Sequence, residues 1–140
     1  MLRTKNEEHN SYNLPDSINQ INWNWKAKNK GVVAYYKNLI AFRKAHPAFR
    51  MTSGEEVREH LVFKRVEDGF ISYQINGHAN GDDWKDILVI YNAKGESVDY
   101  SLEGDWMLGV LGDNFNLEKT ENIEGSIIVP PISMCVLHQK

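Results

Sequence analysis

The sequence predicts a mainly β protein, an antiparallel β-sandwich preceded by a long loop and one α-helix. Three observations support this prediction. Apolar residues recur at three- and four-residue steps over 32–45, as they do on one face of a helix. After Phe49 the apolar period becomes two, which is typical of strands. Residues 1–30 have no sustained periodicity and are rich in Asn, Asp, Ser and Lys, as loops are.

The helix is predicted over 32–45. Its apolar side consists of Val32, Tyr35, Tyr36, Leu39, Ile40 and Phe42. Arg43 and Lys44 suit the negative end of the helix dipole, and Pro47 ends the helix. This apolar stripe is broader than a small sandwich can cover, and each large apolar side chain left in water forfeits about 1.5–3 kcal/mol. We therefore expect part of the stripe to pack against another surface.

Strands are predicted near 59–66, 69–76, 86–92, 97–103, 106–111 and 126–138. Gly- and Asp-rich turns separate them, a spacing typical of a sandwich or partial barrel. The unbroken apolar run within 86–92 predicts a central strand covered on both faces. Pro130 and Pro131 interrupt the last segment, so we expect it to bend there or to lie at a sheet edge.

Composition excludes several classes of partner. With 16 basic and 19 acidic residues the chain lacks the basic footprint of a nucleic-acid binder, and Lys26, Lys28 and Lys30 are expected to be solvated. No apolar run approaches the about 20 residues that cross a bilayer, so no membrane partner is expected. The single cysteine, Cys135, has apolar neighbours and is expected to be a buried structural thiol.

No catalytic residue is predicted within the chain. Glycoside hydrolysis needs two carboxyl groups that face each other across a bond. The acidic pairs Glu7-Glu8, Glu55-Glu56 and Asp82-Asp83 are expected to be solvated turn or surface pairs. The sequence also lacks the Gly-x-Ser-x-Gly elbow, the phosphate-binding loop and the dinucleotide glycine fingerprint, so no cofactor is expected.

No metal site is predicted either. Asn80, Asp82, Asp83 and Asp86 could form an oxygen-rich cation site, but the EF-hand spacing is absent. The five histidines are scattered and have no zinc-ligand spacing.

Aromatic residues give one binding hypothesis. Trp84 and Trp106 could form a platform that stacks on sugar rings, together with Tyr73, Tyr91 and Tyr100. Tryptophans in β-sandwiches serve more often in core packing, and both interpretations stay open. Trp84 lies in a Gly- and Asp-rich turn, so it is expected to be the more exposed of the two.

Several segments resemble one enzyme family. The run from Met1 to Lys5 and the run His9-Asn10-Ser11-Tyr12 through Trp23 resemble the segment after the eighth barrel strand of type I pullulanases. These are α-glucan debranching enzymes of glycoside hydrolase family 13, in the α-amylase superfamily. The helix ending in 42–51 resembles the last barrel helix of that family. The rest, including 86–92, Trp106 and 128–131, resembles its C-terminal β-sandwich.

The resemblance implies a division of the chain into two parts. Residues 1–50 would be the last loop and helix of a truncated (β/α)8 barrel, and 51–140 the C-terminal β-sandwich domain. The nucleophilic Asp, the acid/base Glu and the second Asp would lie upstream, on barrel strands that this chain lacks. The chain alone is therefore not expected to be an enzyme. Met1 would be an internal methionine of a larger enzyme, or a start created by truncation or cloning.

The resemblance also implies a function and a weak site. The chain would position and stabilise a barrel that hydrolyses α-1,6-glucosidic bonds in pullulan or starch-type glucans. Asn10 and Tyr12 would lie at the barrel rim, where they would contact substrate or only brace the loop. One alternative is an α-glucan-binding module acting through Trp84 or Trp106. Another is self-association, in which helices of two copies cover each other. The expected partners are thus the missing barrel, an α-glucan or a second copy, and the sequence does not indicate a compartment.

Overall fold

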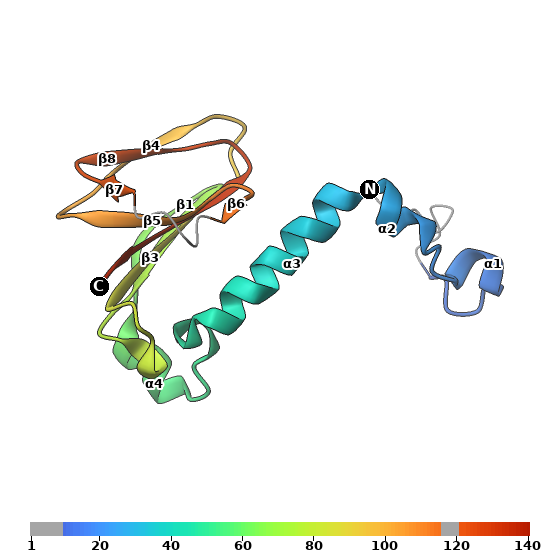
Figure 1. Cartoon of the computed structure of the whole chain (residues 1–140), viewed down its shortest axis with the longest axis horizontal. Coiled ribbons are helices and arrows are strands. Elements are labelled where there is room, and N and C mark those ends of the chain that lie inside the picture. Colours follow the sequence, from blue (N-terminus) through green and yellow to red (C-terminus); the bar gives the residue numbers. More distant parts are fainter. Residues whose placement is uncertain (1–9, 116–120) are drawn as a thin grey trace. The chain divides into compact units, whose positions relative to one another are not determined.

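A computed structural model describes residues 10–115 and 121–140. The chain divides into two compact units, Met1–Lys37 and Asn38–Lys140, called here the first and the second unit. Helix α3 (Lys30–Ala45) begins in the first unit and ends in the second (Figure 1). Within the described ranges, no helix has the length and apolar character needed to cross a membrane.

The first unit contains two short helices within the predicted loop. Helix α1 (Asp16–Asn19) begins with an acidic residue, which suits the positive end of a helix dipole, and α2 (Asn24–Lys28) follows it. Helices of four and five residues make little more than one turn, so they leave no apolar period in the sequence. That is why the sequence shows only a loop here.

The predicted long helix is confirmed. Helix α3 starts two residues earlier than expected, at Lys30, and ends at Ala45 as predicted. His46 has extended backbone angles, and Pro47 opens the 3-10 turn η2 (Pro47–Arg50). The proline therefore ends the helix and redirects the chain toward the sheet.

Helix α4 (Gly54–His60) lies partly where the first strand was expected to begin, so strand β1 starts only at Leu61. Its start is a capping box. Ser53 Oγ accepts a hydrogen bond from the backbone N–H of Glu56 at 3.1 Å, and the Glu56 carboxylate accepts one from the Ser53 N–H at 3.2 Å. These bonds hold the pKa of the Glu56 carboxyl below its ordinary value.

The second unit is built from two antiparallel sheets, which confirms the predicted mainly β sandwich. The strands are β1 (Leu61–Glu67), β2 (Phe70–Ile75), β3 (Asp86–Asn92), β4 (Val98–Ser101), β5 (Trp106–Leu111), β6 (Asn114–Phe115), β7 (Asn122–Ile123), β8 (Ser126–Val129) and β9 (Ser133–Gln139). The larger sheet has the order β1-β2-β3-β9-β5-β6, with β7 also paired to β5. Strands β4 and β8 form the smaller sheet, which lies across from the larger one in Figure 1.

The last predicted strand is in fact two strands in different sheets. Strand β8 pairs with β4, and β9 pairs with β3 and β5. The predicted bend at Pro130-Pro131 is confirmed, since these residues link the two. The buried amide of Asn92 fixes this link, because its Nδ2 donates to the carbonyl oxygens of Val129 at 3.1 Å and Pro130 at 2.9 Å.

The larger sheet has a separate core on each face. The face toward β4 and β8, called here the sandwich face, buries Phe70, Leu88, Ile90, Leu102, Trp106, Leu108, Ile127, Val129, Cys135 and Leu137. The opposite face, called here the helix face, buries Phe42, Ala48, Ile75, Ala79, Ile87, Val89, Val110 and Val136. Strand β3 contributes to both, so the predicted central strand is confirmed. Cys135 is buried as expected, and burial raises the pKa of its thiol to about 12.

Candidate functional site

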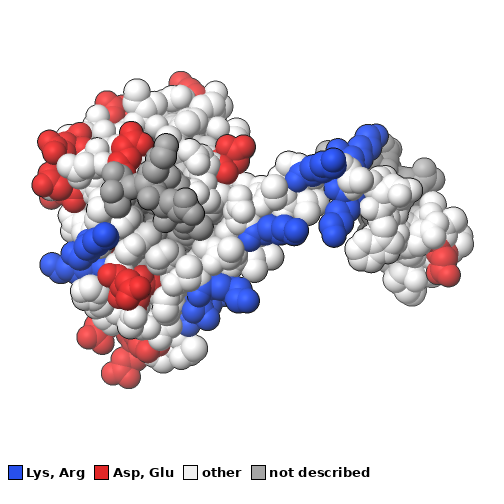
Figure 2. Space-filling model, viewed as in Figure 1, with Lys and Arg blue, Asp and Glu red and all other residues white. Residues whose placement is uncertain are grey.

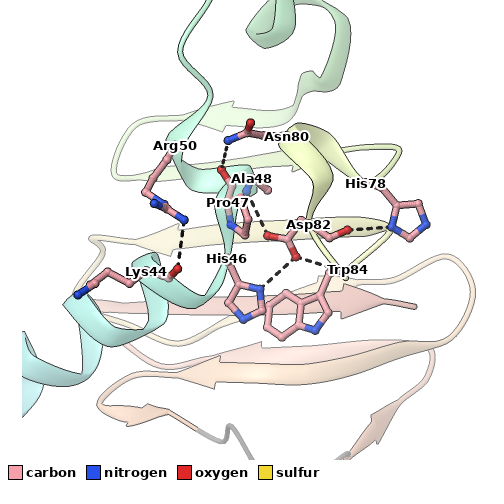
Figure 3. Close-up of polar contacts among 9 residues, drawn as sticks. All are labelled: Lys44, His46, Pro47, Ala48, Arg50, His78, Asn80, Asp82 and Trp84. Atoms are coloured by element: carbon pink, nitrogen blue, oxygen red, sulfur yellow. Dashed lines mark hydrogen bonds and ion pairs between the residues drawn. The ribbon is translucent and has the colours of Figure 1, made fainter.

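Four polar or aromatic side chains meet on the helix face, where the chain leaves α3. His46 follows the helix, Asp82 and Trp84 come from the segment between β2 and β3, and His138 lies on β9 (Figure 3 shows the first three). His46, Asp82 and His138 are all buried, and Trp84 is half-buried. We call these four residues the His–Trp cluster.

Asp82 is the polar centre of the His–Trp cluster. Its Oδ1 lies 3.1 Å from His46 Nδ1 and accepts a hydrogen bond from the backbone N–H of Trp84 at 2.9 Å. Its Oδ2 accepts one from the backbone N–H of Ala48 at 3.1 Å. Burying a carboxylate is costly unless such partners replace water. The prediction that Asp82 is solvated is wrong, because its side chain is fully enclosed. Asp83, its predicted companion, is exposed.

The indole of Trp84 is stacked between two imidazoles. Its ring centroid lies 3.7 Å from that of His46 and 3.7 Å from that of His138, with interplanar angles of 29° and 4°. The indole rests on Gly109, where strand β5 has a register shift. A Cβ atom at Gly109 would lie 3.0 Å from Cη2 of Trp84 and 3.3 Å from the carbonyl oxygen of Val136. Glycine therefore leaves room for this stack, and any side chain at position 109 would press on the indole.

His138 is kept neutral by its surroundings. Burial lowers the pKa of its imidazole to about 4, and the nearby His46 and Lys140 act in the same direction. Within the described ranges, His138 Nδ1 is a buried side-chain nitrogen without a hydrogen-bond partner. An uncharged imidazole of this kind lacks the positive charge that would attract an anion, and its ring packs on the indole.

One further contact holds the β2–β3 segment against the residues after α3, and another lies within the segment (Figure 3). Asn80 Nδ2 donates to the carbonyl oxygen of Pro47 at 2.8 Å, and His78 Nδ1 lies 3.0 Å from the carbonyl oxygen of Asp82. His78 and Asn80 both have φ of 53°, which is uncommon outside glycine. The segment is thus held in a specific shape by bonds to its neighbours.

The contacts of the His–Trp cluster are those of a structural site. A buried His–Asp pair also orients the base of hydrolytic triads. In the described part of the chain, however, His46 makes its hydrogen bond to Asp82, and none is found between it and a serine, threonine or cysteine. Its ring also packs on Phe42, with centroids 4.8 Å apart. The cluster therefore joins the end of α3 to the sheet and offers no nucleophile.

The residues considered for a cation site have other partners. Asp82 bonds inward, Asn80 bonds to Pro47, and Asp86 Oδ1 accepts the N–H of Gly77 at 3.0 Å. Among residues 10–115 and 121–140, no group of three or more His, Cys, Asp or Glu side chains is placed to hold a metal.

In the first unit, Tyr12 belongs to a braced turn, and Asn10 directly precedes it. Ser11 O accepts the Leu14 N–H at 3.1 Å, and Asn19 Nδ2 donates to the carbonyl oxygens of Ser11 at 2.6 Å and Leu14 at 2.9 Å. Asn10 is exposed and Tyr12 is 82% exposed. The turn is therefore held by three hydrogen bonds and presents the phenol outward, while a substrate contact stays a prediction.

The two tryptophans proposed as a sugar platform lie in different places. Trp106 is buried on the sandwich face, and its Nε1 donates to the carbonyl oxygen of Glu103 at 3.0 Å. Trp84 has both ring faces covered by imidazoles. The platform stays a prediction, and a sugar stacking on Trp84 would have to displace one of the histidines.

A basic groove of about 420 Å³ lies within the first unit. It is lined by Trp23, Lys26, Ala27, Lys30, Val33, Ala34 and Lys37. Figure 2 shows basic side chains close together on this unit, whereas acidic side chains are frequent on the second. Lys26 lies in α2 and not in the loop expected from sequence.

Comparison with known proteins confirms the resemblance to pullulanases. Residues 57–114 match the family model of the pullulanase all-beta domain. The chain is 37% identical over 139 residues to the pullulanase of Bacillus subtilis (strain 168), an alignment covering 98% of this chain and 19% of that protein. It is 34% identical over 113 residues to the isoamylase of Pseudomonas amyloderamosa, covering 72% of this chain and 14% of that protein.

A solved structure supports the same resemblance to pullulanases. The pullulanase from Bacillus acidopullulyticus has a TM-score of 0.91 and 38% identity, with 99% of this chain and 17% of that chain covered. The chain thus spans less than a fifth of the length of these relatives.

Proposed function

Because this chain belongs to the pullulanase-type proteins, through its all-beta domain, we propose that it is the non-catalytic C-terminal part of an α-1,6-glucan hydrolase. In this proposal residues 1–50 are the last loop and helix of a (β/α)8 barrel, and 51–140 are the C-terminal domain that positions and stabilises it. The observation that most directly supports this proposal is that the alignment covers 98% of this chain and 19% of the Bacillus subtilis pullulanase. A whole barrel needs about 250 residues, more than this chain has.

Exposed apolar residues on α3 support a missing neighbour. Val32, Tyr36 and Ile40 are 39%, 59% and 58% exposed, whereas Phe42 on the same helix is 3% exposed. The end of the helix is therefore covered by the sandwich domain, while much of its predicted apolar stripe lies in water. Covering each of these side chains would gain about 1.5–3 kcal/mol.

The braced turn adds a second part to the proposal. We place Asn10 and Tyr12 beside the substrate of the whole enzyme, where an amide and a phenol can hydrogen-bond to and stack on a sugar. The exposure of Tyr12 and the two bonds from Asn19 that hold its turn support this role.

The first experiment tests the lack of catalysis. The purified 140-residue chain is incubated with pullulan, and reducing ends are measured against a heat-killed control. We expect no release above the control, and reproducible release would contradict the proposal.

The second experiment tests the stabilising role. Bacillus subtilis pullulanase lacking the residues aligned with this chain is mixed with the chain, and hydrolysis of pullulan and the thermal midpoint are measured. We expect the chain to raise both. The double variant Tyr36→Asp/Ile40→Asp should not do so, whereas the control Asn38→Asp, at an exposed polar position of the same helix, should act as the native chain does. Equal activity of both variants would contradict a role for the exposed apolar stripe.

The alternatives from sequence are separate outcomes of two further measurements. Retarded migration in an amylopectin gel, lost on Trp84→Ala, would favour an α-glucan-binding module. A dimer in sedimentation that Tyr36→Asp dissociates would favour self-association through α3.

A further inference from the structure

A cleft of about 480 Å³ opens between the two sheets of the second unit. Residues of β1, β2, β3, β4, β5 and β9 line it, so it lies at one end of the sandwich interior. Its volume is within the range of ligand sites, about 300–1,000 Å³. It contains none of the residues predicted as sites except Trp106 and Tyr100.

The cleft has an apolar floor and polar walls. Leu88, Leu102 and Trp106 form the floor, and all three are buried. The walls carry the amides of Gln74 and Gln139. A few polar groups around an apolar surface is the common composition of a small-molecule site.

The two glutamines stand at inward-facing positions. Gln74 is opposite Leu88 in the β2–β3 register, and Gln139 follows Leu137 on the same side of β9. Inward positions of a sandwich are normally apolar, as Leu88 and Leu137 are. The cleft therefore occurs where amides replace apolar residues between the sheets.

The amide of Gln74 is open to a ligand. Gln74 is half-buried, and within the described ranges its side chain has no hydrogen-bond partner. Gln74 is not among the buried unpaired side-chain atoms of the described residues, so its amide reaches solvent, and a ligand hydroxyl can take the place of its water. Gln139 Nε2 donates to the carbonyl oxygen of Asp105 at 2.9 Å, which leaves its Oε1 as an acceptor.

The residues at the mouth of the cleft favour a ligand without net charge. Lys64 and Glu103 are both exposed there and carry opposite charges, and Ser101 adds a hydroxyl. Amides, a hydroxyl, a carboxylate and an ammonium together offer donors and acceptors in similar number. A ligand that suits them has many hydroxyls, no charge, and a C–H edge that meets the small part of Trp106 exposed at the floor.

We propose that this cleft binds a short neutral oligosaccharide, with Gln74 and Gln139 hydrogen-bonding its hydroxyls and Trp106 beneath it. The site uses only the second unit, and it does not depend on hydrolysis by a larger enzyme. It also differs from stacking on an exposed indole, because the sugar lies between two sheets.

The test is a titration of the 15N-labelled 140-residue chain with maltotriose, followed by NMR. We expect saturable shifts of the side-chain amides of Gln74 and Gln139 and of the indole N–H of Trp106. Gln74→Leu should weaken binding by about tenfold, the equivalent of one good hydrogen bond. The matched control is Gln20→Leu, at an exposed position in the first unit, which should leave the affinity unchanged.

The opposing results are equally specific. No saturable shift, or shifts centred on Tyr12, Trp23 or Trp84, overturns the site. If glycerol at a matched hydroxyl concentration produces the same shifts, the proposal that the ligand is a saccharide is overturned. If the spectrum shows that Gln74→Leu does not fold, the titration is repeated with Glu103→Gln and with Lys64→Met, which change the exposed mouth of the cleft. Both variants are expected to weaken binding, and unchanged affinity in both would overturn the site. None of these results bears on the complementation of truncated pullulanase, so the two proposals fail separately.

Discussion

The two faces of the larger sheet are stabilised in different ways. The sandwich face buries mainly aliphatic side chains that alternate along neighbouring strands, such as Leu88 and Ile90 on β3 and Leu137 on β9. On the helix face, rings and polar groups pack where α3 ends, with Trp84 between two imidazoles and a buried carboxylate beside them. The first face depends on area removed from water, and the second depends also on specific geometry. They should therefore respond differently to substitution and to pH.

The largest expected effect is that of Phe42→Ala on the helix face. Phe42 is 3% exposed, and its ring lies among those of His46, Phe49, Trp84 and Phe115. We expect the free energy of unfolding, measured with urea, to fall by about 3–5 kcal/mol. Ile40→Ala, two residues away and 58% exposed, is the control and should cost about 0.5 kcal/mol or less. Similar losses for the two would show that the end of α3 does not pack on the sheet.

The next effect tests the polar centre of the helix face. Asp82→Ala leaves the N–H groups of Ala48 and Trp84 without their acceptor, and we expect a loss of about 3 kcal/mol. Asp83→Ala changes the exposed neighbouring carboxylate and should change stability by no more than about 0.5 kcal/mol. Thermal unfolding followed by circular dichroism compares the two. A loss at Asp83 equal to that at Asp82 would contradict the buried network.

The two faces should also differ in their response to acid. The pKa of His138 is about 4 in the folded chain and about 6.5 when unfolded, so between these values the unfolded chain binds the additional proton. Stability from this residue is therefore complete above about pH 6.5 and is lost as the pH falls toward 4.

Urea unfolding at several pH values measures this loss, and His138→Gln should reduce the slope between pH 6.5 and 5. That window lies above the lowered carboxyl pKa values of Glu56 and Glu67, which matter only in stronger acid. An unchanged slope in His138→Gln would assign the acid sensitivity to another residue.

The smallest effect concerns α4, which leads into β1. Ser53→Ala removes the side-chain half of the capping box and should cost about 1 kcal/mol. Thr52→Ala is the control, since Thr52 takes part in the capping through its backbone N–H. Comparison of the two by urea unfolding tests the cap, and equal stability of both variants would show that the Ser53 hydroxyl adds nothing.

The contrast between the faces also explains what the sequence could predict. A strand period of two reveals the sandwich face, so the central strand at 86–92 and the burial of Cys135 were predicted and are confirmed. Pro130-Pro131 revealed the bend, but no local pattern tells that the chain changes sheets there. Helix α4 was not predicted, although the Ser53-x-x-Glu56 capping box is visible in the sequence.

The helix face could not be predicted in the same way. His46 and Asp82 are 36 residues apart, and a polar turn rich in Asp and Gly is normally solvated. Only the fold brings them together, so Asp82 was wrongly expected in water. Trp84 is the more exposed of Trp84 and Trp106, as expected, but the stacking of two imidazoles on its ring was not predicted. The inward glutamines of the cleft were equally hidden, because Gln74 and Gln139 look like ordinary polar positions at strand ends.

The seat of Trp84 on Gly109 has a consequence for how this part of the protein can evolve. With Cη2 of the indole 3.0 Å and the Val136 carbonyl oxygen 3.3 Å from where a Cβ atom would stand, a side chain at position 109 requires the large ring at position 84 to shift. The two positions should therefore change together among related sequences, with a small residue at 84 wherever 109 has gained bulk. Such paired replacement would also leave the two histidines without the ring that separates them, so they should vary in the same lineages.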